Sequence, residues 1–202
     1  MFALIENQQI TKFYSGNKGI ILGDIQYPKS IFTLWSEAER NAIGIFEVTV
    51  DTTNKKDEQW YINTNVSYGV ESNKAVGSYG AATAKAHADA NATDSDGVEL
   101  DPVVVIPGLK TTLIKTVKAQ AAGILQDTDW YIVRKADAGT AVPSAITTHR
   151  AAVRTKCAEM ETQITNASDT PALETLYTYV NIGTEENPVI ERPLGELPTL
   201  ES

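Results

Sequence analysis

The sequence predicts an α+β protein with a small β-rich N-terminal domain, a helical-hairpin C-terminal domain and an extended C-terminal arm. Three observations lead to this prediction: short apolar runs separated by turn residues, a change of composition after residue 80, and apolar residues at helical spacing after residue 102. We therefore divide the 202 residues into a β-rich domain (1–80), an Ala/Asp-rich linker (81–101), a helical hairpin domain (102–181) and an acidic, proline-rich arm (182–202).

The first strands are expected in FALIEN and QQITKFY, with SGNKG (15–19) as a glycine-bearing hairpin turn. GIILGDIQYP follows as a further strand that ends at Pro28, because proline cannot donate to a sheet ladder. WYINTNVSYGVES is another strand-like stretch, and Trp35 and Trp60 are expected to support the core of this domain.

One short helix interrupts these strands. Ser36 and Glu39 have the spacing of a capping box, which predicts a helix from Glu37. Gly44 is expected to end it, and IFEVTV (45–50) alternates like a half-buried strand.

Two longer helices are expected in the second half. GLKTTLIKTVKAQAAGILQ and SAITTHRAAVRTKCAEMETQITNA each carry apolar residues on one helical face, which predicts an αα-hairpin. DTDWYIVRKADAGTAVP, with Gly139 and Pro143, is interpreted as the break between them. A shorter third helix is expected in TPALETLYTYV, with Thr170 as N-cap and Pro171 at the first helical position.

Composition and charge limit the class of partner. The formal net charge is −9 and the sequence pI is about 4.7. Binding to a phosphate backbone or an anionic membrane needs an array of lysines and arginines, so we expect no nucleic-acid partner. No apolar stretch approaches the ~20 residues that cross a bilayer, so no membrane insertion is expected either. An acidic surface is typical of a protein whose partners are other proteins.

The motifs of common enzymes and metal sites are not found in the sequence. There is no P-loop, GxGxxG, HExxH or GxSxG, and the single Cys157 lies in a helical pattern with only His149 nearby. The stretch DSDG fails as a calcium loop, because positions 1 and 12 would be Ala92 and Val103. We expect no enzymatic activity, no cofactor and no metal.

An aromatic–arginine cluster is the main candidate for a functional site. Trp130, Tyr131 and Arg134 lie in the break, and Arg150 and Arg154 are four residues apart on the following helix. The three guanidinium groups are expected to converge near Trp130, with aspartates as partners. Such a cluster either locks the hairpin or docks a partner, and the sequence leaves both interpretations open.

The run LQDTDWYIVR…VP…HRAAVR resembles the C-terminal segment of tailed-bacteriophage tail proteins, among them tail-fibre assembly chaperones and other tail-associated proteins. The matching residues are Leu125, Asp129, Trp130, Pro143, Arg150 and Arg154. PKSIFTLWSEAERNAIGIFEV is similar to phage proteins of this type as well. The chain departs from the chaperone pattern YRQALR, since His149 replaces the tyrosine.

The resemblance implies a non-enzymatic structural or attachment component of a phage tail: an adaptor, baseplate or fibre-associated protein. The alternative is a tail-fibre assembly chaperone, and a glycan-acting tail enzyme ranks last. The implied partners are other tail or fibre proteins and further copies of the chain. The implied location is the virion tail, after synthesis in the host cytoplasm. Trp130, Tyr131, Arg134, Pro143, Arg150 and Arg154 are the expected partner-binding or structural residues.

Overall fold

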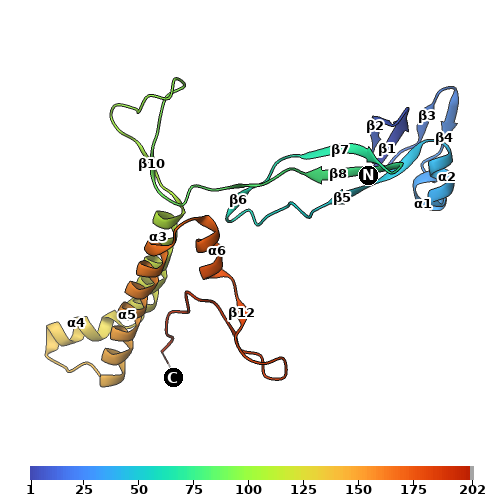
Figure 1. Ribbon diagram of the computed structural model, residues 1–202. Helices are drawn as coiled ribbons and strands as arrows, with labels where there is room; N and C mark the ends of the chain where they lie inside the picture. The colour runs from blue at the N-terminus through green and yellow to red at the C-terminus, as the bar shows by residue number, and fades with distance from the viewer. Residues whose placement is uncertain (201–202) are drawn as a thin grey trace. The chain divides into compact units, whose positions relative to one another are not determined.

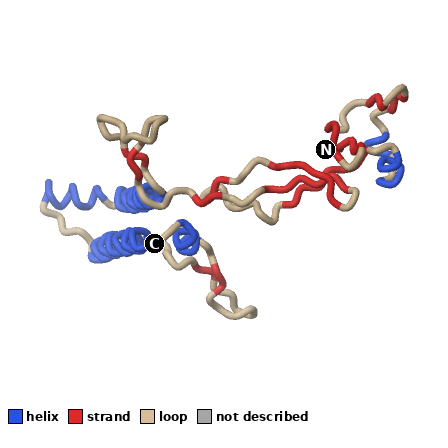
Figure 2. The backbone as a smooth tube through the Cα atoms, turned by 45° about the horizontal axis from the view of Figure 1, so that its top comes forward, coloured by secondary structure: helices blue, strands red, loops and turns tan. Residues whose placement is uncertain are grey.

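The computed structural model describes residues 1–200 and confirms the α+β class, with a β-rich N-terminal part followed by helices (Figure 1). The chain forms two compact units, one from Met1 to Thr83 and one that begins at Ala84. Residues 84–101 of the predicted linker therefore lie in the second unit. Figure 2 shows the strands concentrated in the first unit and the long helices in the second.

A five-stranded sheet, in the order β2-β1-β5-β8-β7, organises the first unit. Its strands are β1 (Phe2–Glu6), β2 (Gln9–Tyr14), β5 (Ile45–Asp51), β7 (Val66–Glu71) and β8 (Lys74–Tyr79). β5 and β8 are parallel, and the other neighbours are antiparallel. The sheet curls so that its two edge strands approach each other. The ring of Phe13 on β2 lies 5.0 Å from that of Tyr68 on β7.

The hairpin turns differ from those predicted. The stretch 15–19 leads from β2 to β3 (Ile20–Leu22), but β3 pairs with β4 (Ile25–Tyr27) and not with β2. The predicted single strand over GIILGDIQYP is therefore wrong. Gly23 has a φ of +56°, a backbone conformation that glycine adopts without strain, and this allows the chain to reverse inside that stretch.

Two short helices cover the core of this unit: α1 (Ile31–Leu34) and α2 (Glu37–Ala42). The predicted capping box is confirmed, with Ser36 and Glu39 each accepting a hydrogen bond from the other's backbone. Ile20, Ile31, Phe32 and Ile45 form the buried centre. Trp35 packs against it and Trp60 is buried, as predicted. The short strands β6 (Tyr61–Ile62) and β9 (Thr83–Ala84) complete the strands up to the boundary.

The second unit is built on the predicted pair of helices, α3 (Leu109–Gln126) and α5 (Ser144–Asn166). The apolar residues that follow the predicted helical spacing on α5 are buried: Ile146, Val153, Cys157, Met160 and Ile164. Leu113, Val117 and Ala121 of α3 are buried as well. This helical pair is held by an amphipathic stripe from each side.

The predicted break at 127–143 contains a third helix, α4 (Asp129–Ala138). Gly139 ends it in the left-handed conformation, with a φ of +68°. The later helix α6 (Thr170–Tyr177) begins one residue earlier than predicted, because Asp169 and not Thr170 is its N-cap. The Asp169 side chain accepts a hydrogen bond from the backbone N–H of Ala172.

Two hairpins extend from the helices of this unit (Figure 1). The first, which we call the arm, spans residues 90–106 and contains β10 (Ala90–Asn91) and β11 (Val105–Ile106). The second, the C-terminal hairpin, contains β12 (Val180–Asn181) and β13 (Ile190–Glu191). The predicted extended segment after 182 thus folds back, and the buried Leu194 donates its N–H to the carbonyl of Leu176.

Candidate protein interface on helix α4

Arg150 fixes the start of α4 to the helical pair. It lies on α5, is only 7% exposed, and reaches across to the end of α3. Its guanidinium donates to the Leu125 carbonyl at 2.7 Å and to the Thr128 hydroxyl oxygen at 2.6 Å. A further bond of 2.8 Å joins it to a carboxylate oxygen of Asp129, the first residue of α4. One buried side chain therefore sets the direction in which α4 leaves the pair.

Thr128 completes this junction. Its side chain is buried and donates to the carbonyl of Leu125, while its oxygen accepts from Arg150. Asp129 follows at the positive end of the α4 dipole, where a carboxylate is favourable. Thr128 did not figure in the sequence-based cluster, although its place between two helices makes it a natural capping position.

Trp130, Tyr131 and Arg134 form a stack on α4. The two rings have centroids 3.8 Å apart, and the Arg134 guanidinium lies 4.6 Å from the centre of Trp130 and 5.4 Å from that of Tyr131. Cation–π contacts of this kind hold a long side chain in place at a modest gain. The stack gives α4 a rigid surface composed of two aromatic rings and a guanidinium group.

The expected convergence of three guanidinium groups on Trp130 is met by Arg134 alone. Arg150 points to the end of α3 instead, and Arg154 is exposed, with no ion pair found for it within residues 1–200. Pro143 precedes α5 as its N-cap residue and takes no part in the stack. The structure thus separates an anchor, Arg150 with Asp129, from an exposed surface, Trp130 with Tyr131 and Arg134.

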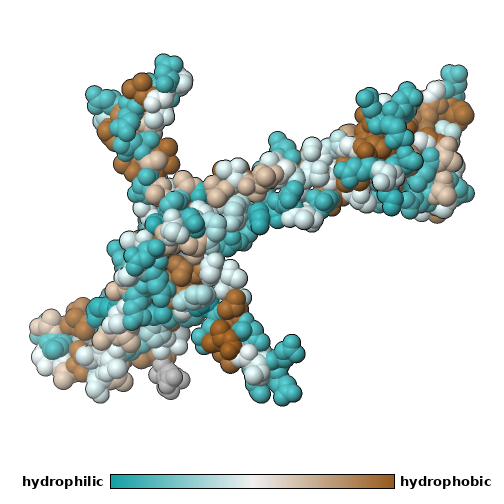
Figure 3. All heavy atoms as spheres, in the orientation of Figure 1, coloured by the Kyte–Doolittle hydropathy of each residue, from teal (hydrophilic) through white to brown (hydrophobic). Residues whose placement is uncertain are grey.

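This exposed surface continues with apolar residues that the sequence-based cluster omitted. Ile132 is 43% exposed, Trp130 51% and Val133 65%, and no residue of α4 is buried. The signal was available in the run WYIV, which is too apolar for a loop between two helices. Figure 3 shows hydrophobic residues gathered at this end of the unit and on the arm.

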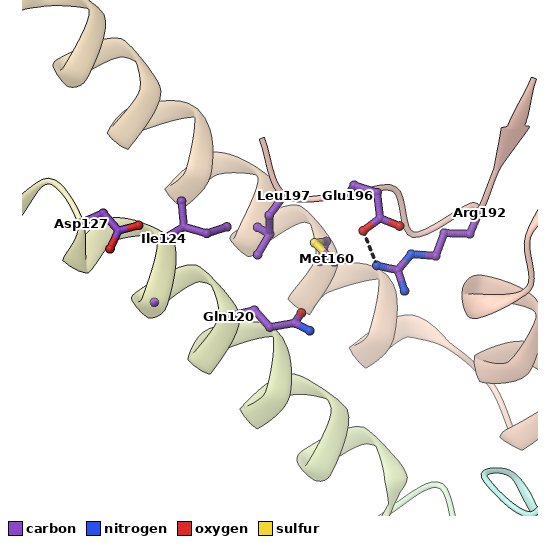
Figure 4. Close-up of a pocket in the computed structure, with 8 residues that line it drawn as sticks. Gln120, Ile124, Asp127, Met160, Arg192, Glu196 and Leu197 are labelled. Atoms are coloured by element: carbon purple, nitrogen blue, oxygen red, sulfur yellow. Dashed lines mark hydrogen bonds and ion pairs between the residues drawn. The ribbon is translucent and has the colours of Figure 1, made fainter. Parts of the chain in front are cut away.

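A second surface feature of the unit is an open groove of about 490 Å³, bordered by α3, α5 and the C-terminal segment (Figure 4). Arg192 lies on its wall but is already paired with Glu196 at 2.7 Å, and its guanidinium stacks over the rings of Tyr177 and Tyr179. Because these charges are satisfied within the chain, the groove is better explained as the seam where the C-terminal segment packs.

Cys157 has the environment of a structural residue. It is buried in the helical pair, and burial together with a hydrogen bond to Glu161 raises the pKa of its thiol. A raised pKa lowers the thiolate fraction on which nucleophilic reactivity depends.

Carboxylates in the acidic tip of the arm are engaged by the backbone. Asp94 accepts hydrogen bonds from the N–H groups of Asp96 and Val98, which closes the turn that contains Gly97.

Over residues 1–200, no cluster of three or more metal-ligating His, Cys, Asp or Glu side chains is present. In the same range, no helix is long and apolar enough to cross a membrane.

No protein-family model, curated protein or solved structure matches the chain.

Proposed function

We propose that the chain is a non-enzymatic structural or attachment component of a bacteriophage tail that works through protein–protein contacts, with α4 as a docking surface. The observation that carries this proposal is that α4 buries none of its side chains in its own unit while exposing Trp130, Ile132 and Val133.

A helix as short as α4 needs support from other parts of the protein or from a partner to stay folded. Ten residues are too few for a helix to be stable in water on its own. The Arg150 anchor supports one end only, so the exposed stack and the apolar residues beside it are unsupported in a single copy. Tryptophan and arginine at the centre of a contact are the residue types that carry most binding energy in protein interfaces. A partner that covers α4 accounts for both observations.

The class of assembly comes from the resemblance. The segment from Leu125 to Arg154 that resembles tail proteins is the segment that contains the anchor and the stack. Of the residues that carry the resemblance, Leu125, Asp129 and Arg150 form the anchor of α4 and Trp130 lies in its exposed stack, which supports a tail protein over an unrelated binding protein.

Quantitative mass spectrometry of purified, intact particles of the encoding phage tests the proposal. We expect the chain to be present at a fixed ratio to the major tail protein. Detection only in infected-cell lysate, bound to fibre subunits, would replace the proposal with the chaperone alternative. Absence from both would overturn the assignment to the tail.

A companion variant tests the role of α4. Trp130→Ala is expected to leave the free energy of unfolding within about 1 kcal/mol of wild type, because the ring is half exposed, while incorporation into particles falls. Ile62→Ala, which shortens an apolar side chain of the other unit that is 60% exposed, serves as the matched control and should be incorporated normally.

A further inference from the structure

One strand of the arm is apolar on both faces. β11 lies in the run Val103–Ile106, and each of these four residues is between 49% and 59% exposed, although successive side chains of a strand point to opposite faces. A continuous apolar run is typical of a strand that is covered on both faces. A two-stranded ribbon of this kind is at best marginally stable without a covering partner.

The arm also carries a distinct charge. Residues 90–106 contain four carboxylates, Asp94, Asp96, Glu99 and Asp101, and no lysine or arginine, so their net charge is −4. Residues 109–166, which form α3, α4 and α5, contain eight lysines and arginines against five acids and carry +3. Within an acidic protein, the helical region is thus the complementary surface for the arm.

α4 has the features that the arm requires. It exposes Trp130, Ile132 and Val133 as an apolar surface, and Lys135 of α4 and Arg154 of α5 have no ion-pair partner within residues 1–200. The arm joins the N-terminal end of α3, whereas α4 joins its C-terminal end. At a rise of 1.5 Å per residue the two are separated by about 27 Å along α3, and the arm points away from α4 (Figure 1).

We propose that the arm of one copy docks on α4 of a second copy. This inference rests on the proposed function and names the partner of the same surface. Because two different surfaces meet, the contact is heterologous, and repetition gives a closed ring or an open filament.

The apolar area available to such a contact is modest. The six large apolar residues of the arm (Val98, Leu100 and Val103–Ile106) and the three of α4 together expose roughly 800 Å², which is about half of the total area buried in an interface of standard size, so polar residues of both surfaces have to supply the remainder. Every copy in a head-to-tail assembly uses both surfaces, so the whole of this area is covered.

Sedimentation velocity of the full chain with charge-reversed variants tests the proposal. Wild type should form oligomers, and Asp96→Lys/Asp101→Lys in the arm or Lys135→Glu/Arg154→Glu on the helices should each give monomers. An equimolar mixture of the two variants should recover oligomers in which the variants alternate, because each arm then meets helices of opposite charge in the other variant. The quadruple variant should recover oligomers. Glu185→Lys/Glu186→Lys in the C-terminal hairpin is the control with the same charge change and should assemble like wild type.

Several results would overturn the proposal. These are a monomeric wild type, helix variants that assemble normally while arm variants do not, a mixture that stays monomeric, or a control that fails as the arm variants do. Circular dichroism of each variant identifies any that is unfolded. If the arm variant is unfolded, Val104→Asp is used in its place and should likewise give monomers.

A failure of self-assembly with the chain still present in particles would refute the second copy as the partner and leave the tail assignment intact. Self-assembly of a chain that is absent from particles and from fibre complexes would refute the tail assignment alone.

Discussion

At the scale of single residues, Arg150 and Arg154 look equivalent in the sequence and are opposite in the structure. Both lie on α5 one turn apart, yet Arg150 makes three hydrogen bonds at the α3–α4 junction and Arg154 is exposed. A helical repeat identifies which residues share a face, but it does not identify which of them meets a carbonyl at the end of another helix.

This difference predicts unequal effects on stability. Arg150→Ala should lower the free energy of unfolding by about 2 kcal/mol, because it removes a hydrogen-bonded buried group and leaves the junction without its donor. Arg154→Ala should stay within about 0.5 kcal/mol of wild type. Urea denaturation measures both, and equal losses for the two variants would contradict the anchoring role of Arg150.

Two glycines predict opposite outcomes for the same substitution. A Cβ on Gly108 would lie 2.4 Å from the backbone carbon and oxygen of Ala88, whereas one on Gly123 would meet no atom within 4 Å. Gly108→Ala should therefore destabilise the base of the arm, because backbone atoms cannot yield cheaply. Gly123→Ala should stabilise α3 by up to about 1 kcal/mol, because glycine is unfavourable inside a helix. Thermal unfolding of the pair tests this, and a gain in stability for Gly108→Ala would refute the close approach.

At the scale of elements, a carboxylate reinforces the backbone hydrogen bonds that join the base of the arm to α3. Asp89 accepts hydrogen bonds from the Gly108 N–H at 2.8 Å and from the Thr111 hydroxyl at 2.9 Å, and these bonds lower the pKa of Asp89 from its ordinary value. A lowered pKa in the folded state means that the ionised form contributes stability, which is present above the ordinary pKa and is lost as the pH falls through the lowered value.

The Gly108 amide should report this titration directly. Its NMR shift is expected to move with an apparent pKa lower than that of an ordinary aspartate, and the movement should disappear in Asp89→Asn, which keeps the acceptor oxygen but has no proton to gain. A midpoint that is not lowered would mean that the two hydrogen bonds do not hold the carboxylate in solution.

Prediction from the sequence succeeded where the decisive contacts are local. The capping box of α2 and the buried stripes of α3 and α5 depend on residues within a few positions of one another. α4 was missed because Gly139 and Pro143 suggested a loop, whereas the contact that orients this helix comes from Arg150, twenty-one residues beyond Asp129.

The hairpins were missed for a different reason. The Ala/Asp-rich composition of 81–101 suggested a linker, and the strand that pairs with Ala90–Asn91 lies beyond that range, at Val105–Ile106. The parallel pairing of β5 with β8 likewise joins segments separated by more than twenty residues. For the site, the contact of Arg134 with Trp130 follows from their spacing on one helix, but the division of the cluster into an anchor and an exposed stack depends on the geometry between helices.

At the scale of the whole molecule, the two units have separate cores, one around Ile31 and Ile45 and the other between α3 and α5. The tryptophans are divided between them, since Trp35 and Trp60 lie in the first unit and Trp130 in the second. We therefore expect two unfolding transitions. In Trp130→Phe, fluorescence follows the first unit, and circular dichroism at the helical band follows mainly the second. Coincident transitions by both probes in urea would show that the units unfold as one.

The contact between Phe13 and Tyr68 has a consequence for how the chain avoids unwanted pairing. Edge strands with free N–H and C=O groups recruit strands from other molecules and so favour aggregation. Because β2 and β7 face each other across the curled sheet, an incoming strand has to separate two packed rings before it can pair. The first unit thus resists growth by strand addition, and a crowded array of many copies can form without its sheets fusing.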